Sequence, residues 1–158
     1  MFDMLVKLYD LSDEIINLDE LKNEGISIKR ALVPDKYTII NYAKNEFYEQ
    51  WAGECDVAFS NHPVSCFIAV KDKQVIGFAC YDVTAKGYFG PTGVSKRYRG
   101  LGIGKVLLIK CLLSMREEGY GYAIIGSVAE AAGFYEKTVN AIAIESSSPG
   151  VYERLIDN

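Results

Sequence analysis

Val94-Ser-Lys-Arg-Tyr-Arg-Gly-Leu-Gly-Ile-Gly-Lys105 is the stretch that decides the fold, because it joins a strand-like run to a helix through a glycine-rich turn. Gly100, Gly102 and Gly104 let the backbone come close to an anion. The helix that follows offers unpaired backbone N–H groups and the positive end of its dipole. The stretch therefore predicts a loop that binds phosphate.

Lysines and arginines surround this loop in a chain that is otherwise acidic. Residues 83–116 contain seven of them and no Asp or Glu, although the 158-residue chain has a formal net charge of −4. Residues 1–24 show the reverse, with seven acidic residues against two lysines. Nucleic acid is therefore not expected as a partner, and a small ligand with clustered phosphates fits better.

Two common phosphate-binding loops do not fit this sequence. A Walker loop needs Ser or Thr after Gly-Lys, but Val106 follows Gly104-Lys105 and leaves no hydroxyl for magnesium. A dinucleotide fingerprint reads Gly-x-Gly-x-x-Gly at the first strand of its fold, whereas the glycines here alternate well past the middle of the chain. Both nucleotide hydrolysis and dinucleotide binding are disfavoured.

The six residues Arg99-Gly-Leu-Gly-Ile-Gly104 resemble the pyrophosphate-binding motif of the Gcn5-related N-acetyltransferases, the GNAT family. The pattern of that motif is Arg or Gln, two residues, Gly, one residue, and Gly or Ala, and every position matches. Downstream, Phe134-Tyr-Glu-Lys137 is similar to the Phe-Tyr-x-Lys helix that usually follows the fifth strand of the family. The resemblance extends over residues 26–156.

This resemblance implies an α/β fold with a central mixed, mostly antiparallel sheet of about six to seven strands. Helices flank the sheet, and its fourth and fifth strands splay apart. Acetyl-CoA or another acyl-CoA is the implied co-substrate, attacked directly in a ternary complex by a primary amine of a small molecule or peptide; no metal is implied. A second class of function stays open, namely an acyl-CoA-binding sensor or interaction module without turnover.

Length and composition favour a single domain over residues 1–158, with residues 1–24 as an acidic N-terminal extension. The extension should pack on the domain or on a second subunit, which leaves a homodimer open. The sequence has no run of about eighteen apolar residues and no signal-peptide pattern, so we expect a cytoplasmic protein with no membrane partner. Four dispersed cysteines and the single His62 predict no zinc site.

Hydrophobic periodicity predicts an order of strands and helices along the chain. Strands are expected over residues 4–9, 26–31, 64–70, 74–82, 88–94, 122–125, 141–144 and 151–156. Helices are expected over residues 13–23, 36–49 and 51–59, after the glycine loop, and at Phe134. Gly90-Pro91 and Gly93 should distort the strand at 88–94, because proline lacks the ladder N–H and glycine often marks a bulge.

For the coenzyme, the resemblance implies that backbone N–H groups of residues 100–105 hold the pyrophosphate. It also implies that the backbone of Gly93 and Val94 pairs with the pantetheine arm. The predicted coenzyme-binding residues are Thr92, Gly93, Val94, Arg99, Gly100, Leu101, Gly102, Ile103, Gly104 and Lys105. Taken alone, Lys105 is equally consistent with a solvated helix residue.

Tyr135 matches the family position whose phenol usually donates a proton to the coenzyme thiolate, and an ordinary pKa of about 10 keeps that proton in place at neutral pH. The glutamate base that some members carry on the fourth strand has no counterpart in residues 88–94. Asp82, at the end of the strand expected over residues 74–82, is the nearest candidate base in sequence, and Glu54 is another. A water chain, or an amine that arrives partly neutral, could replace a dedicated base.

The resemblance also implies that the acceptor lies against the two helices that follow residues 26–31 and against the link between the last two strands. These segments offer Tyr48, Trp51, Glu54, Asp56 and Tyr152. Aromatic faces combined with carboxylates suit a cationic amine. Gly126 and Ser127 depart from the family pattern here, because an asparagine often ends the fifth strand.

Overall fold

The structure is a computed structural model that describes residues 1–15 and 17–157. Within these residues one seven-stranded mixed sheet forms the centre, in the order β2-β3-β4-β5-β6-β1-β7. The strands are β1 (Phe2–Lys7), β2 (Ser27–Arg30), β3 (Cys66–Lys71), β4 (Gln74–Tyr81), β5 (Tyr88–Val94), β6 (Tyr122–Val128) and β7 (Ile142–Ala143). Neighbouring strands are antiparallel, except that β5 and β6 run parallel. The predicted fold class is confirmed.

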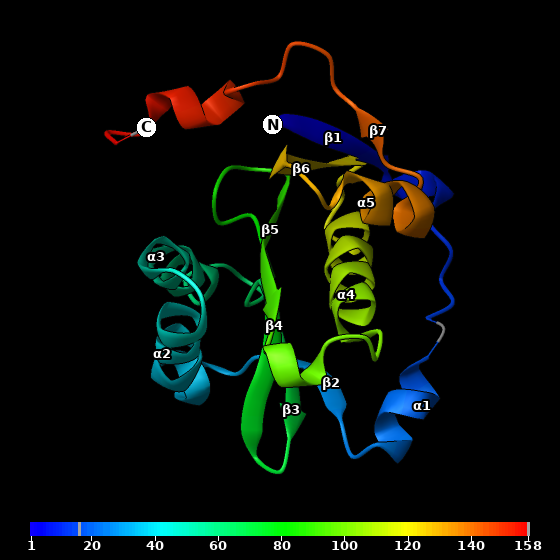
Figure 1. The fold of residues 1–158 in the computed structure, drawn as a ribbon, viewed down its shortest axis with the longest axis vertical. Coiled ribbons are helices and arrows are strands. Elements are labelled where there is room, and N and C mark those ends of the chain that lie inside the picture. Colours follow the sequence, from blue (N-terminus) through cyan, green and yellow to red (C-terminus); the bar gives the residue numbers. More distant parts are fainter. Residues whose placement is uncertain (16, 158) are drawn as a thin grey trace.

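Helices cover both faces of this sheet. The helices are α1 (Leu18–Asn23), α2 (Lys36–Glu46), α3 (Glu49–Ala58), α4 (Ile103–Glu117) and α5 (Ala132–Val139). Figure 1 shows α2 and α3 on one face and α4 and α5 on the other. Alternate side chains of the central strands enter two separate cores: Phe67 and Ala79 pack with α4, whereas Ile68 and Phe78 pack with α2 and α3. Period-two alternation therefore fixes which residues of β3 and β4 face each helix layer.

The strands β5 and β6 separate soon after they meet. Tyr88 pairs with Ile124 and Phe89 with Ile125, after which β5 continues only beside β4. The β4–β5 register also shifts between Ala79 and Tyr81, so the irregularity predicted for residues 88–94 is present. The splay leaves one edge of β5 without a strand partner in the described chain.

The strand predicted over residues 151–156 is wrong. Residues 150–154 form a short 3-10 helix, and Leu155 and Ile156 are 57% and 100% exposed, so this segment has no buried face to place in a sheet. The remaining position is filled by β1, which lies between β6 and β7 with Met4 and Val6 fully buried. Residues 1–24 thus contribute a strand to the sheet itself.

The helix predicted over residues 13–23 is also shorter than expected. In the structure α1 covers Leu18–Asn23, and Ile16, part of the predicted apolar stripe, lies outside the described residues. Residues 11–15 instead run as irregular chain, where Arg116 of α4 donates a hydrogen bond to Leu11 O (2.7 Å). This hydrogen bond attaches residues 11–15 to α4, which packs on one face of the sheet.

Candidate active site

The gap between β5 and β6 opens into two adjoining cavities. The loop cavity, about 620 Å³, lies along the end of β5, the glycine turn at residues 99–105 and the start of α5. The α3 cavity, about 760 Å³, lies between α3, the end of β6 and the helix at residues 150–154. The residues that line both cavities are Phe89, Thr92, Arg99, Ala131 and Tyr135. A ligand that spans both cavities would pass these five side chains.

The loop cavity gathers most of the coenzyme-binding residues predicted from sequence. The lining includes Thr92, Gly93, Val94, Arg99, Gly100, Gly102, Ile103, Gly104 and Lys105. Leu101 does not line it and is 42% exposed. Tyr98, Leu108 and Ala131 line the cavity as well without having been predicted to do so, and so does Phe134, which belongs to the Phe-Tyr-x-Lys motif but was not expected to bind the coenzyme.

The glycine turn has the geometry of an anion cradle. Gly100 and Gly102 have φ of 87° and 86°, in the left-handed region where glycine carries no steric penalty. The first helical bond of α4 runs from Val106 N to Gly102 O (3.2 Å), so the preceding N–H groups of the first turn remain available at the cavity. These N–H groups and the helix dipole fit a diphosphate.

The exposed edge of β5 forms the second part of this cavity. Thr92 Oγ1 donates to Phe78 O (3.1 Å), and Arg99 Nε donates to Val94 O (3.1 Å). A Cβ at Gly93 would lie only 2.6 Å from a ring atom of Phe47, the residue after α2, so the close packing of this ring on β5 favours glycine there. Beyond Phe89 the strand offers unpaired backbone to an extended ligand, in the manner of strand addition.

Tyr135 stands at the junction of the two cavities. Its side chain is 8% exposed and meets the ring of Phe89 edge-on at a centroid distance of 6.4 Å. Burial raises the pKa of Tyr135 to about 12, which keeps the phenol protonated. Among the described residues no group hydrogen-bonds its hydroxyl, which is therefore available to a ligand. Tyr135 can act as a proton donor at this junction.

The α3 cavity brings together side chains that are far apart in sequence. Tyr48, Trp51, Glu54 and Tyr152, all expected near the acceptor, line it. Trp51 also packs on the rings of Tyr48 (5.0 Å) and Phe78 (5.9 Å), so it belongs both to the wall and to the core. Asp56 does not line this cavity; it pairs with Lys36 Nζ at 2.9 Å.

Glu54 is the best-placed carboxylate for proton acceptance. Its side chain lines the α3 cavity and accepts a hydrogen bond from Thr84 Oγ1. Burial raises the pKa of Glu54 above its ordinary value, and the hydrogen bond from Thr84 only partly offsets this. A carboxylate with a raised pKa is a stronger base, which suits deprotonation of an amine.

Asp82, the other candidate base, lines neither cavity. One carboxylate oxygen accepts from Gly87 N (2.7 Å) and the other from the Tyr120 hydroxyl (2.8 Å). These bonds hold the connection between β4 and β5. The structure thus places Asp82 in the β4–β5 connection and outside both cavities, whereas Glu54 lines one of them.

Two polar residues near the α3 cavity were missed from sequence. Thr84 lies in the β4–β5 connection and reaches Glu54 only because α3 crosses above it. Asp3 is 5% exposed and accepts a hydrogen bond from Ser127 N (2.8 Å) at the end of β6. Neither carried a sequence signal, since each acts through a tertiary contact.

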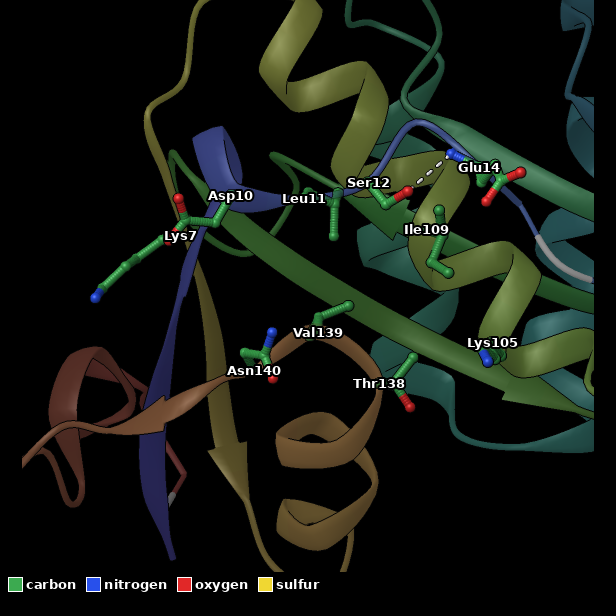
Figure 2. A pocket seen from close by; sticks show the side chains of 10 residues that line it. All are labelled: Lys7, Asp10, Leu11, Ser12, Glu14, Lys105, Ile109, Thr138, Val139 and Asn140. Carbon is green, nitrogen blue, oxygen red and sulfur yellow. Dashed lines mark hydrogen bonds between the residues drawn. The ribbon is translucent and has the colours of Figure 1, made fainter.

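A smaller cavity of about 300 Å³ borders the loop cavity through Lys105. It lies between the end of β1, α4 and the end of α5, and Figure 2 shows Leu11, Ile109 and Val139 at its centre, with Lys7 pointing away. Ser12 Oγ accepts a hydrogen bond from Glu14 N (3.1 Å) at its rim. Its charges are mixed, so the cavity itself indicates no ligand class.

In the described parts of the chain, no group of three or more His, Cys, Asp or Glu side chains is arranged to hold a metal ion. The cysteines Cys55, Cys66, Cys80 and Cys111 are buried as free thiols. Across residues 1–15 and 17–157, no helix is both long and apolar enough to cross a membrane.

Comparison with known families gives one match over most of the chain. The model for the acetyltransferase (GNAT) family matches residues 27–140, which run from β2 to the end of α5 and include both cavities' central residues. No curated protein matches the chain. The family resemblance seen in the glycine turn and at Phe134 is confirmed.

Solved structures share this fold at low sequence identity. A GCN5-related glucosamine N-acetyltransferase region of a fungal multi-domain beta-N-acetylglucosaminidase is 13% identical with a TM-score of 0.72, over 90% of this chain and 19% of that one. A GCN5-related N-acetyltransferase from Sphaerobacter thermophilus is 18% identical with a TM-score of 0.69, over 90% and 48%. An acetyltransferase from Brucella melitensis in complex with acetyl-CoA is 20% identical with a TM-score of 0.53, over 69% and 80%. The chain thus spans less than half the length of the first two.

Proposed function

The chain belongs to the GNAT acetyltransferase family, and from that premise we propose that it moves an acetyl group from acetyl-CoA to a primary amine of a small molecule or peptide. The observation that carries this proposal is the position of Tyr135. Its protonated phenol lies where a cavity with an anion cradle meets a cavity lined by the half-buried carboxylate of Glu54. Donor, acceptor and proton donor can therefore meet at one point.

The loop cavity suits the donor. Backbone N–H groups of the glycine turn and the first turn of α4 would bind the pyrophosphate, with the side chain of Lys105 adding positive charge. The unpaired edge of β5 would hold the pantetheine arm as an added strand, which directs the thioester toward Tyr135. The related structure solved with acetyl-CoA supports this choice of donor.

The α3 cavity suits the acceptor. Glu54 accepts a proton from the ammonium form of the amine, and the neutral nitrogen attacks the thioester carbonyl carbon in a direct, ternary-complex reaction. A C–N bond forms and the C–S bond breaks. Tyr135 gives its phenolic proton to the departing thiolate, and the second proton that the attacking nitrogen loses as the C–S bond breaks passes to solvent, so the products are an acetamide and the free coenzyme thiol. Solvent restores the proton of Tyr135 and removes the one held by Glu54.

The test is a screen of the purified protein with acetyl-CoA and a panel of primary amines. Release of free thiol is followed over time, and mass spectrometry identifies the acetylated amine. The proposal expects thiol release that depends on the amine and yields one acetamide per thiol. Binding of acetyl-CoA with no amine-dependent thiol release would contradict it and favour a sensor or interaction module.

A further inference from the structure

Gly126, near the end of β6, is crowded by neighbouring side chains, whereas its backbone conformation alone would admit an L side chain. Its φ lies outside the left-handed region, so an L side chain would cause no backbone strain. A Cβ at this position would nevertheless collide with the Tyr152 hydroxyl and lie 3.1 Å from a ring carbon of Tyr88. The hydroxyl of Tyr152 therefore occupies the volume that a side chain at position 126 would take, on the wall of the α3 cavity.

The segment that carries Tyr152 is anchored by Asp3 of β1. Asp3 N donates to Ser147 Oγ (2.7 Å), and Ile144 N donates to Asp3 O (2.9 Å). The carboxylate of the same residue accepts from Ser127 N, next to Gly126. In Figure 1, β1 and the helix at residues 150–154 lie at the same end of the molecule. One buried residue thus fixes both the end of β6 and the chain that leads to Tyr152.

The charges around Tyr152 are mostly negative. Glu54 and Glu130 line the α3 cavity, and among its described lining residues Arg99 is the one cation, at the border with the loop cavity. Burial, followed by the negative charges of Glu54 and Asp3, raises the pKa of Tyr152 to about 12. The phenol is therefore a neutral hydrogen-bonding group at working pH.

We propose that Tyr152 is a specificity-determining residue of the acceptor site, and that the acceptor is a primary amine on a ring-bearing body without negative charge. The faces of Trp51 and Tyr48 pack on the ring and attract the ammonium group. Glu54 and Glu130 favour a cation and disfavour an amine that also carries a carboxylate. The Tyr152 hydroxyl, standing in for a side chain at position 126, hydrogen-bonds the amine. This inference rests on the proposed function, because it names the acceptor class of the same transfer.

A fluorescence titration tests the inference without turnover. Trp51 is the single tryptophan of the chain and lies in the cavity wall, so its emission reports acceptor binding to the protein loaded with CoA. The probes are 2-phenylethylamine, L-phenylalanine, which adds a carboxylate, and hexylamine, which lacks the ring. We expect 2-phenylethylamine to bind at least about ten-fold more tightly than either of the others, as the loss of favourable charge or ring packing predicts.

Two variants separate the hydroxyl from the ring. Tyr152→Phe should weaken 2-phenylethylamine binding about ten-fold or more, the effect of one hydrogen bond to a charged group, and should leave CoA affinity unchanged. Gly126→Ala should weaken binding at least as much, because the added methyl displaces the Tyr152 hydroxyl. Tyr37→Phe is the matched control, since Tyr37 is 72% exposed and lines neither cavity. Circular dichroism melting confirms that each variant is folded.

The possible results distinguish this inference from the proposed function. Equal affinities for 2-phenylethylamine and L-phenylalanine, no binding of any probe, or an affinity unaltered in folded Tyr152→Phe would overturn the inference. Thiol release with any amine would still support the transfer reaction in those cases. Conversely, Tyr152-dependent binding of 2-phenylethylamine without thiol release would support this acceptor site and overturn the proposed transfer.

Discussion

The loop cavity and the α3 cavity adjoin each other but are built in opposite ways. The loop cavity comes mainly from one continuous stretch, residues 92–105, and offers mainly backbone groups to a ligand. The α3 cavity comes from separate segments, around residues 48–54, 84, 89–92, 99, 125–131, 135 and 152, and it presents mainly side chains. Backbone geometry set by nearby glycines can be recognised locally, whereas a cavity of distant side chains exists only after the chain has folded. Substitutions in the two cavities should therefore have different effects on coenzyme affinity and on the reaction.

The largest effect is expected in the loop cavity. Gly102→Glu should lower coenzyme affinity by at least about 100-fold, because it places bulk and negative charge where we propose that the pyrophosphate binds, and Coulomb repulsion is strong at short range. The φ of 86° and a Cβ position 2.9 Å from Asn17 Nδ2 add strain to any side chain there. Isothermal titration calorimetry with CoA measures the loss.

Gly121→Glu is the matched control for this change. It adds the same charge where a Cβ meets nothing within 4 Å and φ is not in the left-handed region. CoA affinity should stay within about two-fold of the unsubstituted chain, because the charge is remote and screened. Unchanged affinity in folded Gly102→Glu would remove this turn as the anion site.

A substitution at the junction of the cavities should change the catalytic rate and not the affinity for CoA. Tyr135→Phe keeps the buried ring but removes the proton donor, so CoA affinity should be preserved while kcat falls about 10- to 100-fold, the lower range for general acid catalysis. Because burial raises the pKa of Tyr135 to about 12, its deprotonation should not limit the rate below about pH 11. Stopped thiol assays across pH measure both quantities. An unaltered kcat would leave Tyr135 as a packing residue, with water as the proton source.

The α3 cavity should respond in its pH dependence. Glu54→Gln keeps an acceptor for Thr84 but cannot take a proton, so kcat/KM should fall about ten-fold with CoA affinity intact. In the unsubstituted enzyme the rate should decline as pH falls through the raised pKa of Glu54, because the protonated acid is no base. That acid limb should be absent in the variant. A variant that keeps the same acid limb would assign it to another group.

The smallest effect is expected on the stability of the fold when Glu54 is replaced by Gln. A carboxyl whose pKa is higher in the folded than in the unfolded chain binds its proton more tightly when folded. Its contribution to stability is therefore present below the unfolded pKa and is lost as pH rises through the folded pKa. Glu54→Gln should then match or exceed the unsubstituted melting temperature at pH 8. A clear drop at pH 8 would show that the ionised carboxylate stabilises the fold.

The core of the sheet could be predicted from sequence because its signals are local. The strand at residues 88–94 was predicted with the bounds that the structure shows. The helix after the glycine turn and the helix that contains Phe134 were also placed correctly. Alternation, glycine positions and proline positions act within a few residues of one another. The strand predicted over residues 151–156 was wrong for the same reason. The apolar residues of this segment suggest a strand, but no local signal shows that β1 already lies beside β6.

The sequence by itself determined the glycine turn that leads into α4, the positions of the strands β3 and β4, and the family. Each depends on backbone conformation or periodicity that neighbouring residues fix. Only the tertiary structure decided that Glu54 and not Asp82 faces the cleft, and that Asp3 and Tyr152, from opposite ends of the chain, meet at Gly126. Such contacts depend on which distant segments pack together. The residues next to a side chain in the sequence do not show which distant residue it will contact in the folded chain.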